Sequence, residues 1–138
     1  MKLIRPATRQ DEPVILRILK ELDLYYQSQR IEDFFLLEEA GQVVGLAQLK
    51  EFPKYYFLSS LGIIPSHQHR GLAAFILQEL FLIAKKDIYI YTVIPEFFER
   101  FGFQSIPQTS GLPSKKSYEC ADCYPDKCVT MVRLCRDT

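Results

Sequence analysis

The stretch from Leu61 to Leu80, LGIIPSHQHRGLAAFILQEL, joins an apolar strand pattern to an apolar helix pattern through a short polar hinge. The hinge contains Pro65, two histidines, an arginine and Gly71. A further strand pattern follows at residues 87–93. A strand, a core helix and another strand in this order predict a right-handed crossover, which makes part of the sheet parallel. The hinge therefore indicates an α/β fold.

The remaining patterns predict a hairpin-rich sheet around this crossover. Residues 7–24 read as a helix with one apolar face, and Asp11 is a better cap than Thr8 because Pro13 is tolerated in a first turn. The helix from Leu72 to Lys85 is apolar on nearly every side, so we expect it to be sandwiched in the core. Further helix and strand patterns lie at 2–6 (strand), 33–40 and 43–52 (hairpin), 55–64 (strand), 95–101 (helix), 102–106 (strand) and 128–135 (strand).

These elements predict one α/β domain, residues 1–138, with a mixed, mostly antiparallel sheet and helices on both faces. Lys+Arg and Asp+Glu balance at 17 each, so no global positive charge points to nucleic acid. The apolar runs are shorter than the ~20 residues that span a bilayer, and the first residues lack the apolar core of a signal peptide. We therefore expect a cytoplasmic protein that engages neither nucleic acid nor membrane.

The hinge has three readings. It is a basic surface loop, a metal site built from His67 and His69, or a cradle for a phosphorylated ligand. The two histidines lack a third ligand nearby, which disfavours zinc. The first amides of a helix have no intrahelical partner and attract anions, and Gly71 and Ala73 would let a pyrophosphate approach them. The cradle is the interpretation we favour.

Two motifs in register strengthen it. Gln68, Gly71 and Ala73 resemble the Q/R-x-x-G-x-G/A motif of the GNAT superfamily of N-acetyltransferases, and FFERFGF at 97–103 is similar to the second signature of that family. The resemblance covers most of the chain. It implies a GNAT-like fold with a splayed strand pair, and acetyl-CoA as co-substrate in the gap between the strands.

The resemblance also implies roles for particular residues. The main chain of the strand before the hinge should hold the pantetheine arm of the cofactor, and the hinge and first helical turn should hold its pyrophosphate. An acceptor amine would then attack the thioester directly, without a side-chain nucleophile. The cofactor-binding residues predicted in this way are Leu61, Gly62, Ile63, Gln68, His69, Arg70, Gly71, Leu72, Ala73 and Ala74.

The sequence departs from the family at the position of the catalytic acid. Many members carry a tyrosine where this chain has Phe98, and a phenyl ring donates no proton. Tyr91 is the candidate substitute, with water and a half-buried structural tyrosine as the alternatives. Ser59 and Ser60 could orient a water or simply complete a strand.

The four cysteines, Cys120, Cys123, Cys128 and Cys135, all lie in the last 19 residues. Their spacing could supply a structural zinc site, although we favour free thiols. The same tail is similar to that of short stand-alone amino-acid N-acetyltransferases, including proteins assigned as N-acetylglutamate synthases. This likeness implies the α-amine of glutamate or a related amino acid as acceptor. The cationic residues that could hold an acidic substrate are Arg9, Arg100, Lys115 and Lys116.

Two other functions stay open at this point. The acceptor could be a protein amine or a polyamine, or the chain could bind acyl-CoA without turning it over. A homodimer is also open, since Tyr25, Tyr26, Tyr55 and Tyr56 could serve an interface or the core.

Overall fold

The computed structural model describes residues 1–25, 29–107, 112 and 129–135. In this part of the chain seven strands form one sheet in the order β1-β2-β3-β4-β5-β7-β6. Only β4 and β5 run parallel, and every other neighbouring pair is antiparallel. The predicted mixed, mostly antiparallel sheet is therefore confirmed, and the parallel pair lies where the hinge predicted the crossover.

The elements follow the sequence patterns closely. The strands are β1 (Lys2–Pro6), β2 (Phe34–Glu39), β3 (Gln42–Glu51), β4 (Tyr55–Ile63), β5 (Asp87–Thr92), β6 (Gln104–Ile106) and β7 (Val129–Arg133). The helices are α1 (Glu12–Glu21), α2 (Leu72–Ile83) and α3 (Pro95–Glu99), with single 3-10 turns at Arg9–Asp11, Ile31–Asp33 and Pro65–His67.

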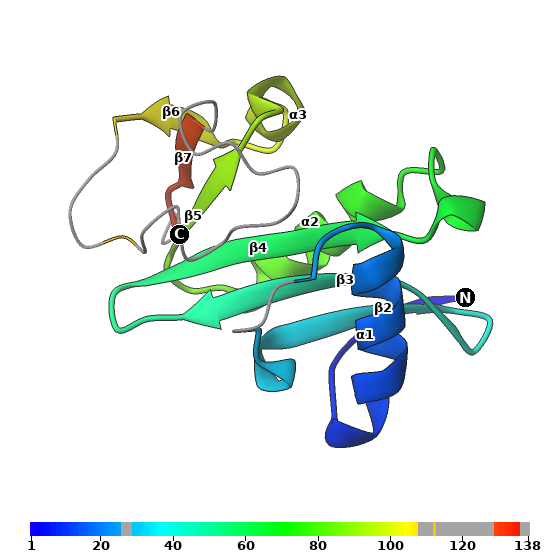
Figure 1. Cartoon of the computed structure of the whole chain (residues 1–138). Helices are drawn as coiled ribbons and strands as arrows, with labels where there is room; N and C mark the ends of the chain where they lie inside the picture. Colours follow the sequence, from blue (N-terminus) through cyan, green and yellow to red (C-terminus); the bar gives the residue numbers. More distant parts are fainter. Residues whose placement is uncertain (26–28, 108–111, 113–128, 136–138) are drawn as a thin grey trace.

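The centre of the sheet is covered on both faces, as predicted. Strand β3 has six consecutive buried residues, Val44 to Leu49, and such a run requires cover on both sides, since neighbouring side chains of a strand point in opposite directions. Helix α1 crosses one face of the sheet, and α2 lies behind β4 on the other (Figure 1). A side chain at Gly45 would meet Ile76 of α2, and one at Gly62 would meet Leu22 just after α1. The two faces can thus be called the α1 face and the α2 face.

Helix α2 is less enclosed than its composition suggests. Its buried residues, Leu72, Ile76, Leu77 and Leu80, recur at helical spacing and form a single stripe. The side chains of Leu82 and Ile83 are 70% and 45% exposed. The prediction of a helix sandwiched in the core is wrong, because one stripe of α2 is buried while Leu82 and Ile83 are exposed. The helix also ends at Ile83 rather than at Lys85.

Strand β4 is kinked in the middle by a β-bulge. Its register with β3 shifts where Leu46 and Gln48 pair with Gly62 and Ser59, so β4 holds one extra residue at this point. Ser60 carries the distortion, with φ at +55°. The parallel pairing with β5 ends shortly before the bulge, at Phe57. Beyond that residue the two strands separate.

The N-terminal strand and α1 are joined by a charged cluster. The guanidinium of Arg5 contacts both carboxylate oxygens of Asp11, at 2.8 and 2.9 Å, and also donates to Glu38 on β2. Asp11 occupies the predicted N-cap position, but its side chain accepts from Thr8 rather than from α1. The Arg5 guanidinium and the Thr8 amide together hold the pKa of the Asp11 carboxyl well below its ordinary value of 3.8.

No helix within the described residues has the length and apolarity needed to cross a membrane.

Replacing Asp11 by Asn should lower the free energy of unfolding by roughly 1–2 kcal/mol at neutral pH, because a charge-assisted pair is lost. Because folding lowers the pKa of Asp11, its ionised carboxyl stabilises the fold above pH ~3.8. This stabilisation is lost as the carboxyl becomes protonated at lower pH. The difference between wild type and Asp11→Asn should therefore shrink as pH falls from 5 to 2. Urea unfolding at several pH values measures it. Asp23→Asn, at an exposed turn, is the matched control, and equal losses in both variants would contradict the role of the cluster.

Candidate active site

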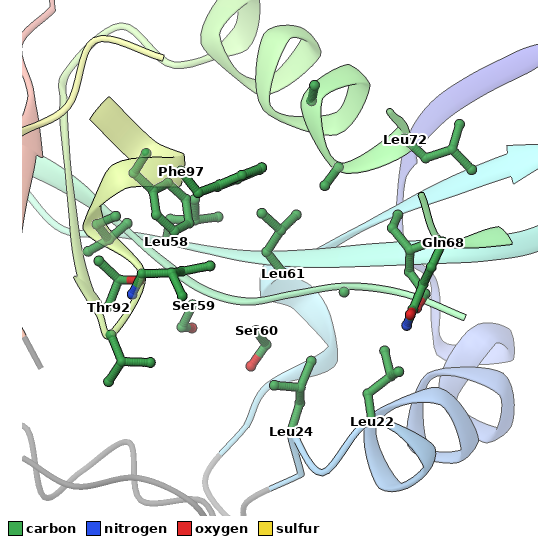
Figure 2. A pocket seen from close by; sticks show the side chains of 18 of the residues that line it. Leu22, Leu24, Leu58, Ser59, Ser60, Leu61, Gln68, Leu72, Thr92 and Phe97 are labelled. Carbon is green, nitrogen blue, oxygen red and sulfur yellow. The ribbon is translucent and has the colours of Figure 1, made fainter. Parts of the chain in front are cut away.

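A cavity of about 940 Å³ opens where β4 and β5 separate. Its wall comes from five segments of the chain: the turn after α1, the second half of β4, the hinge with the first turn of α2, the end of β5 with the residues that follow it, and α3 (Figure 2). The lining residues are Leu22, Leu24, Phe57–Ile63, His67–His69, Gly71–Ala74, Ile90–Ile94, Phe97, Phe98 and Arg100. Most of these side chains are apolar.

The cavity reaches both faces of the sheet because the strands are no longer paired there. Leu22 and Leu24 lie on the α1 face, against Gly62. Ile63 lies on the α2 face, close to α2. Gly62 and Ile63 pair with β3 along one edge of β4, so the opposite edge borders the gap. That edge offers main-chain groups to anything bound between the strands.

The hinge brings open helical amides to the α2-face end of the cavity. Gly71 is the N-cap of α2, with φ at +76°, and no side chain caps the helix. His69 also has positive φ, at 66°. A Cβ built on Gly71 would meet no atom within 4 Å. The backbone conformation favours glycine here, and the space beside it is open.

Two hinge side chains that we predicted as cofactor ligands have protein partners. The amide of Gln68 donates to the carbonyl of Ile63 at 2.9 Å, which ties the hinge to the end of β4. Arg70 is not among the lining residues, and its guanidinium pairs with Glu39 at 3.1 Å. Nine of the ten predicted cofactor residues line the cavity; Arg70 is the exception.

The candidate acid, Tyr91, lines the cavity from β5. Its ring packs edge-on against Phe57, with centroids 4.8 Å apart. Phe98 lines the cavity from α3 and is only 7% exposed. Glu96 and Glu99 of the same helix are exposed and outside the lining. Tyr91 is therefore the one phenol among the described lining residues.

Two serines of β4 line the cavity, and each is held by a glutamine. Ser59 donates to the side-chain oxygen of Gln48, which is fully buried on β3, at 2.9 Å. Gln29 donates to the hydroxyl oxygen of Ser60, also at 2.9 Å. Polar groups are thus placed at the α1-face end of an otherwise apolar wall.

No carboxylate belongs to the lining among the described residues, so the cationic side chain of Arg100 is not neutralised within the wall. The guanidinium of Arg100 lies over the ring of Phe97, 5.2 Å from its centroid. Of the other cations expected to hold an acidic substrate, Arg9 pairs with Glu32 at 3.6 Å, away from the cavity. Lys115 and Lys116 lie outside the described residues.

Two ionisable groups lie near the serines without joining the lining. Burial raises the pKa of the Asp33 carboxyl above its ordinary value of 3.8, while Arg30, Lys50 and the Gln48 side chain act in the opposite direction. Burial lowers the pKa of Lys50 below 10.5, and Asp33 opposes that change. The side chain of Gln48 thus connects this pair to Ser59.

Within the described ranges no three His, Cys, Asp or Glu side chains lie close enough to hold a metal ion. Cys120, Cys123 and Cys128 lie outside those ranges. Cys135 follows β7, where its amide donates to Asp87 at 2.7 Å. The zinc alternative at the cysteine tail stays untested.

Sequence reasoning missed the turn after α1 and the two glutamines. The helical pattern predicts Leu22 as an ordinary core residue, and Leu24 is the last residue of the predicted helix. A polar residue inside the buried run VVGLAQL was the available signal for Gln48. No local pattern marked Gln29, because its contact with Ser60 spans 31 residues.

The family model for the acetyltransferase (GNAT) domain matches residues 30–105. An uncharacterized N-acetyltransferase of Chlorobaculum tepidum, CT2212, is 22% identical over 100 residues, which are 69% of this chain and 64% of that protein. The chain thus spans less than two thirds of this relative's length.

Solved structures share the fold at low identity. N-acetylglutamate synthase from Neisseria gonorrhoeae, complexed with coenzyme A and L-arginine, has a TM-score of 0.78 and 23% identity over 99% of this chain and 34% of its own. The ribosomal-protein-S18-alanine N-acetyltransferase from Escherichia coli has a TM-score of 0.72 and 16% identity over 100% of this chain and 96% of its own. The family model covers more than half of the 138 residues, and the chain belongs to the GNAT acetyltransferase family.

Proposed function

We propose that this chain is an acetyl-CoA-dependent N-acetyltransferase whose acceptor is the amine of a small molecule, the α-amine of an amino acid such as glutamate. The observation that carries the proposal is the convergence of two features on one cavity. The unpaired edge of β4 and the uncapped start of α2 both border it.

The residues present fit acetyl-CoA. The open space beside Gly71 would admit a pyrophosphate to the first amides of α2, which a larger residue would obstruct. The main chain of Leu61, Gly62 and Ile63 would hold the pantetheine arm along the free edge of β4. The apolar wall suits its carbon chain. The gonococcal synthase of the same fold was crystallised with coenzyme A.

Within this proposal the pyrophosphate-binding residues are His69, Arg70, Gly71, Leu72, Ala73 and Ala74, through their main-chain amides. The Arg70 side chain contributes less than we expected, because Glu39 holds it off the wall. Gln68 acts indirectly, since its contact with Ile63 fixes the angle between β4 and the hinge.

Acetyl-CoA, when bound, would supply the acetyl group as an activated thioester. The chain's own part is to position the two substrates and to move a proton. Tyr91 is the residue we assign to donate a proton, from its phenol oxygen to the departing sulfur. The lining, as far as the chain is described, offers no carboxylate as a general base, so the amine would lose its proton to water.

The gap between the strands supports opposite routes for the two substrates. The uncapped start of α2 lies at the α2-face end, where the cofactor would enter. Ser59, Ser60 and Leu24 line the α1-face end, which leaves that end for the acceptor. Arg100 is the remaining described candidate to hold an acidic side chain.

One observation favours a second function, an acyl-CoA-binding module without turnover. Phe98 stands where many members of the family carry a tyrosine and is buried against Phe97 and Phe103, so this position offers no proton donor. Cofactor binding without thiol release from any amine would select this alternative.

Gly71→Leu should abolish acetyl-CoA binding, because its side chain would fill the open space at the helix start. Gly41→Leu is a matched control: Gly41 has φ at +81°, its built Cβ also meets nothing within 4 Å, and it lies in the turn between β2 and β3. Both variants should lose about 1–2 kcal/mol of stability through backbone strain. Only wild type and Gly41→Leu should gain thermal stability with acetyl-CoA. A normal shift for Gly71→Leu would show the cradle to be misassigned.

Tyr91→Phe should lower kcat on the order of 10- to 100-fold while leaving the KM for acetyl-CoA unchanged, because only the proton donor is removed. Tyr89→Phe, on the same strand and outside the lining, is the control and should behave as wild type. Steady-state thiol release measures both. An unchanged kcat in Tyr91→Phe would assign the proton to water instead.

Thiol release should be faster with glutamate or another amino acid than with spermidine or a short peptide. A polyamine carries a second cation, and the described wall has no carboxylate to pair with it. A colorimetric panel at equal amine concentrations and one mildly alkaline pH provides the measurement. Turnover confined to polyamines or peptides would replace the small-amino-acid assignment with one of those acceptors.

A further inference from the structure

The bulge in β4 turns two consecutive hydroxyls toward the same part of the cavity. In a regular strand Ser59 and Ser60 would point to opposite faces. The positive φ of Ser60 and the extra residue in the register break this alternation. Figure 2 shows both serine side chains on the side of Leu24, while Leu61 points the other way. The α1-face end of the cavity therefore receives a pair of hydroxyls.

The hydroxyl of Ser60 is directed as a donor. The side-chain nitrogen of Gln29 donates to the Leu24 carbonyl at 3.1 Å and to Ser60 Oγ at 2.9 Å. A carbonyl can only accept, so its contact fixes which end of the Gln29 amide is nitrogen. Ser60 must then accept from Gln29, and its own hydrogen is available to a bound molecule.

The hydroxyl of Ser59 is directed in the opposite sense. The side-chain oxygen of Gln48 faces Ser59 Oγ, and an amide oxygen can only accept a hydrogen bond. Ser59 donates its hydrogen to that oxygen, at 2.9 Å, and presents lone pairs to the cavity.

We propose that Ser59 and Ser60 form an acceptor–donor pair that recognises an α-amine together with the carboxylate or carbonyl oxygen on the neighbouring carbon. The amine N–H would donate to Ser59 Oγ, and the oxygen would accept from the Ser60 hydroxyl. The assignment rests on the proposed function and narrows it to acceptors in which one carbon atom carries both the primary amine and a carboxylate or carbonyl group.

Such a pair of hydroxyls rejects a ligand that leaves one of them without a hydrogen-bond partner. A simple alkylamine or an ω-amine supplies donors only, so the Ser60 hydroxyl would lose its contact with water and gain no partner. Sites that bury a polar group without a partner reject the ligand that leaves it so. The largely apolar wall around the serines, as far as the chain is described, makes the loss larger than it would be in water.

The test compares, for each L-amino acid that the enzyme acetylates, the acid, its α-carboxamide and its decarboxylated amine. The acid and the amide should both be acetylated. The kcat/KM of the decarboxylated amine should be at least ~10-fold lower, which corresponds to the loss of about one hydrogen bond to a charged or polar group. The amide arm separates a free amino acid from an N-terminal peptide: a strong preference for the amide indicates a peptide-like acceptor that satisfies the same pair.

Ser60→Gly is the decisive variant, because glycine tolerates the positive φ and the substitution removes the hydroxymethyl side chain without straining the bulge. It should raise the KM for the acid roughly 10-fold and raise kcat/KM for the decarboxylated amine, because the hydroxyl that this amine leaves without a partner is gone. Ser59→Ala should lower kcat/KM for both, since each presents an amine. Ser105→Ala, an exposed residue of β6 outside the lining, is the control for a serine deletion.

Gln48→Met tests the orientation of Ser59 independently. It removes the oxygen that fixes the hydroxyl, while keeping an unbranched side chain of similar length in the core. Adding Ser59→Ala to Gln48→Met should then cost less than Ser59→Ala alone, because the two act as one unit. Additive losses would contradict the arrangement.

Calorimetric titration with acetyl-CoA accompanies every variant and should give unchanged affinity. A wild-type chain that binds acetyl-CoA but treats the acid and the decarboxylated amine equally overturns the serine assignment and leaves the proposed function standing. A wild-type chain that does not bind acetyl-CoA overturns both.

Discussion

The separation of β4 from β5 after Phe57 is the constraint on which the rest of this structure depends. A parallel pair that stayed zipped along its length would have no cavity, since the main-chain groups of each strand would satisfy the other. The bulge at Ser60 lies just beyond the last paired residue and increases the local twist of β4. The antiparallel pairing of β4 with β3 continues on the other edge, so the strand can diverge without losing its place in the core.

Where the two strands separate, the cavity passes through the sheet from the α1 face to the α2 face. Helix α2 starts at one opening and the turn after α1 borders the other. A ligand with an anionic head and a long apolar tail fits the opening beside α2. The uncapped amides of α2 and the open space at Gly71 would receive the head, and the unpaired edge of β4 would receive the tail. The second opening is lined by the hydroxyls of Ser59 and Ser60, which Gln48 and Gln29 hold from outside the lining. The described wall thus has polar groups at its two ends and apolar side chains between them.

The polar groups near the second opening are arranged in layers. Asp33 and Lys50 are partly buried behind Gln48, and Gln48 in turn holds Ser59 at the wall. A charge held one residue away from the cavity can fix the direction of a hydroxyl without exposing itself to the ligand. At the hinge, too, a charged side chain is kept out of the cavity wall, because Glu39 pairs with Arg70. The backbone amides are then the donors beside the open space at Gly71.

Periodicity and turn chemistry in the sequence were sufficient for the elements, their order and the hinge, because those features depend on neighbours within a few residues. Gly71 at the start of an apolar helix, and Pro13 in the first turn of α1, each follow from local backbone restrictions. Several features were not predictable in this way. They are the exposure of Leu82 and Ile83, the ion pair of Arg70 with Glu39, and the contacts of Gln29 with Ser60 and of Gln48 with Ser59. They depend on which segments pack together across 11 to 31 positions of the chain, and only the assembled sheet, with its bulge, decides which side chains meet.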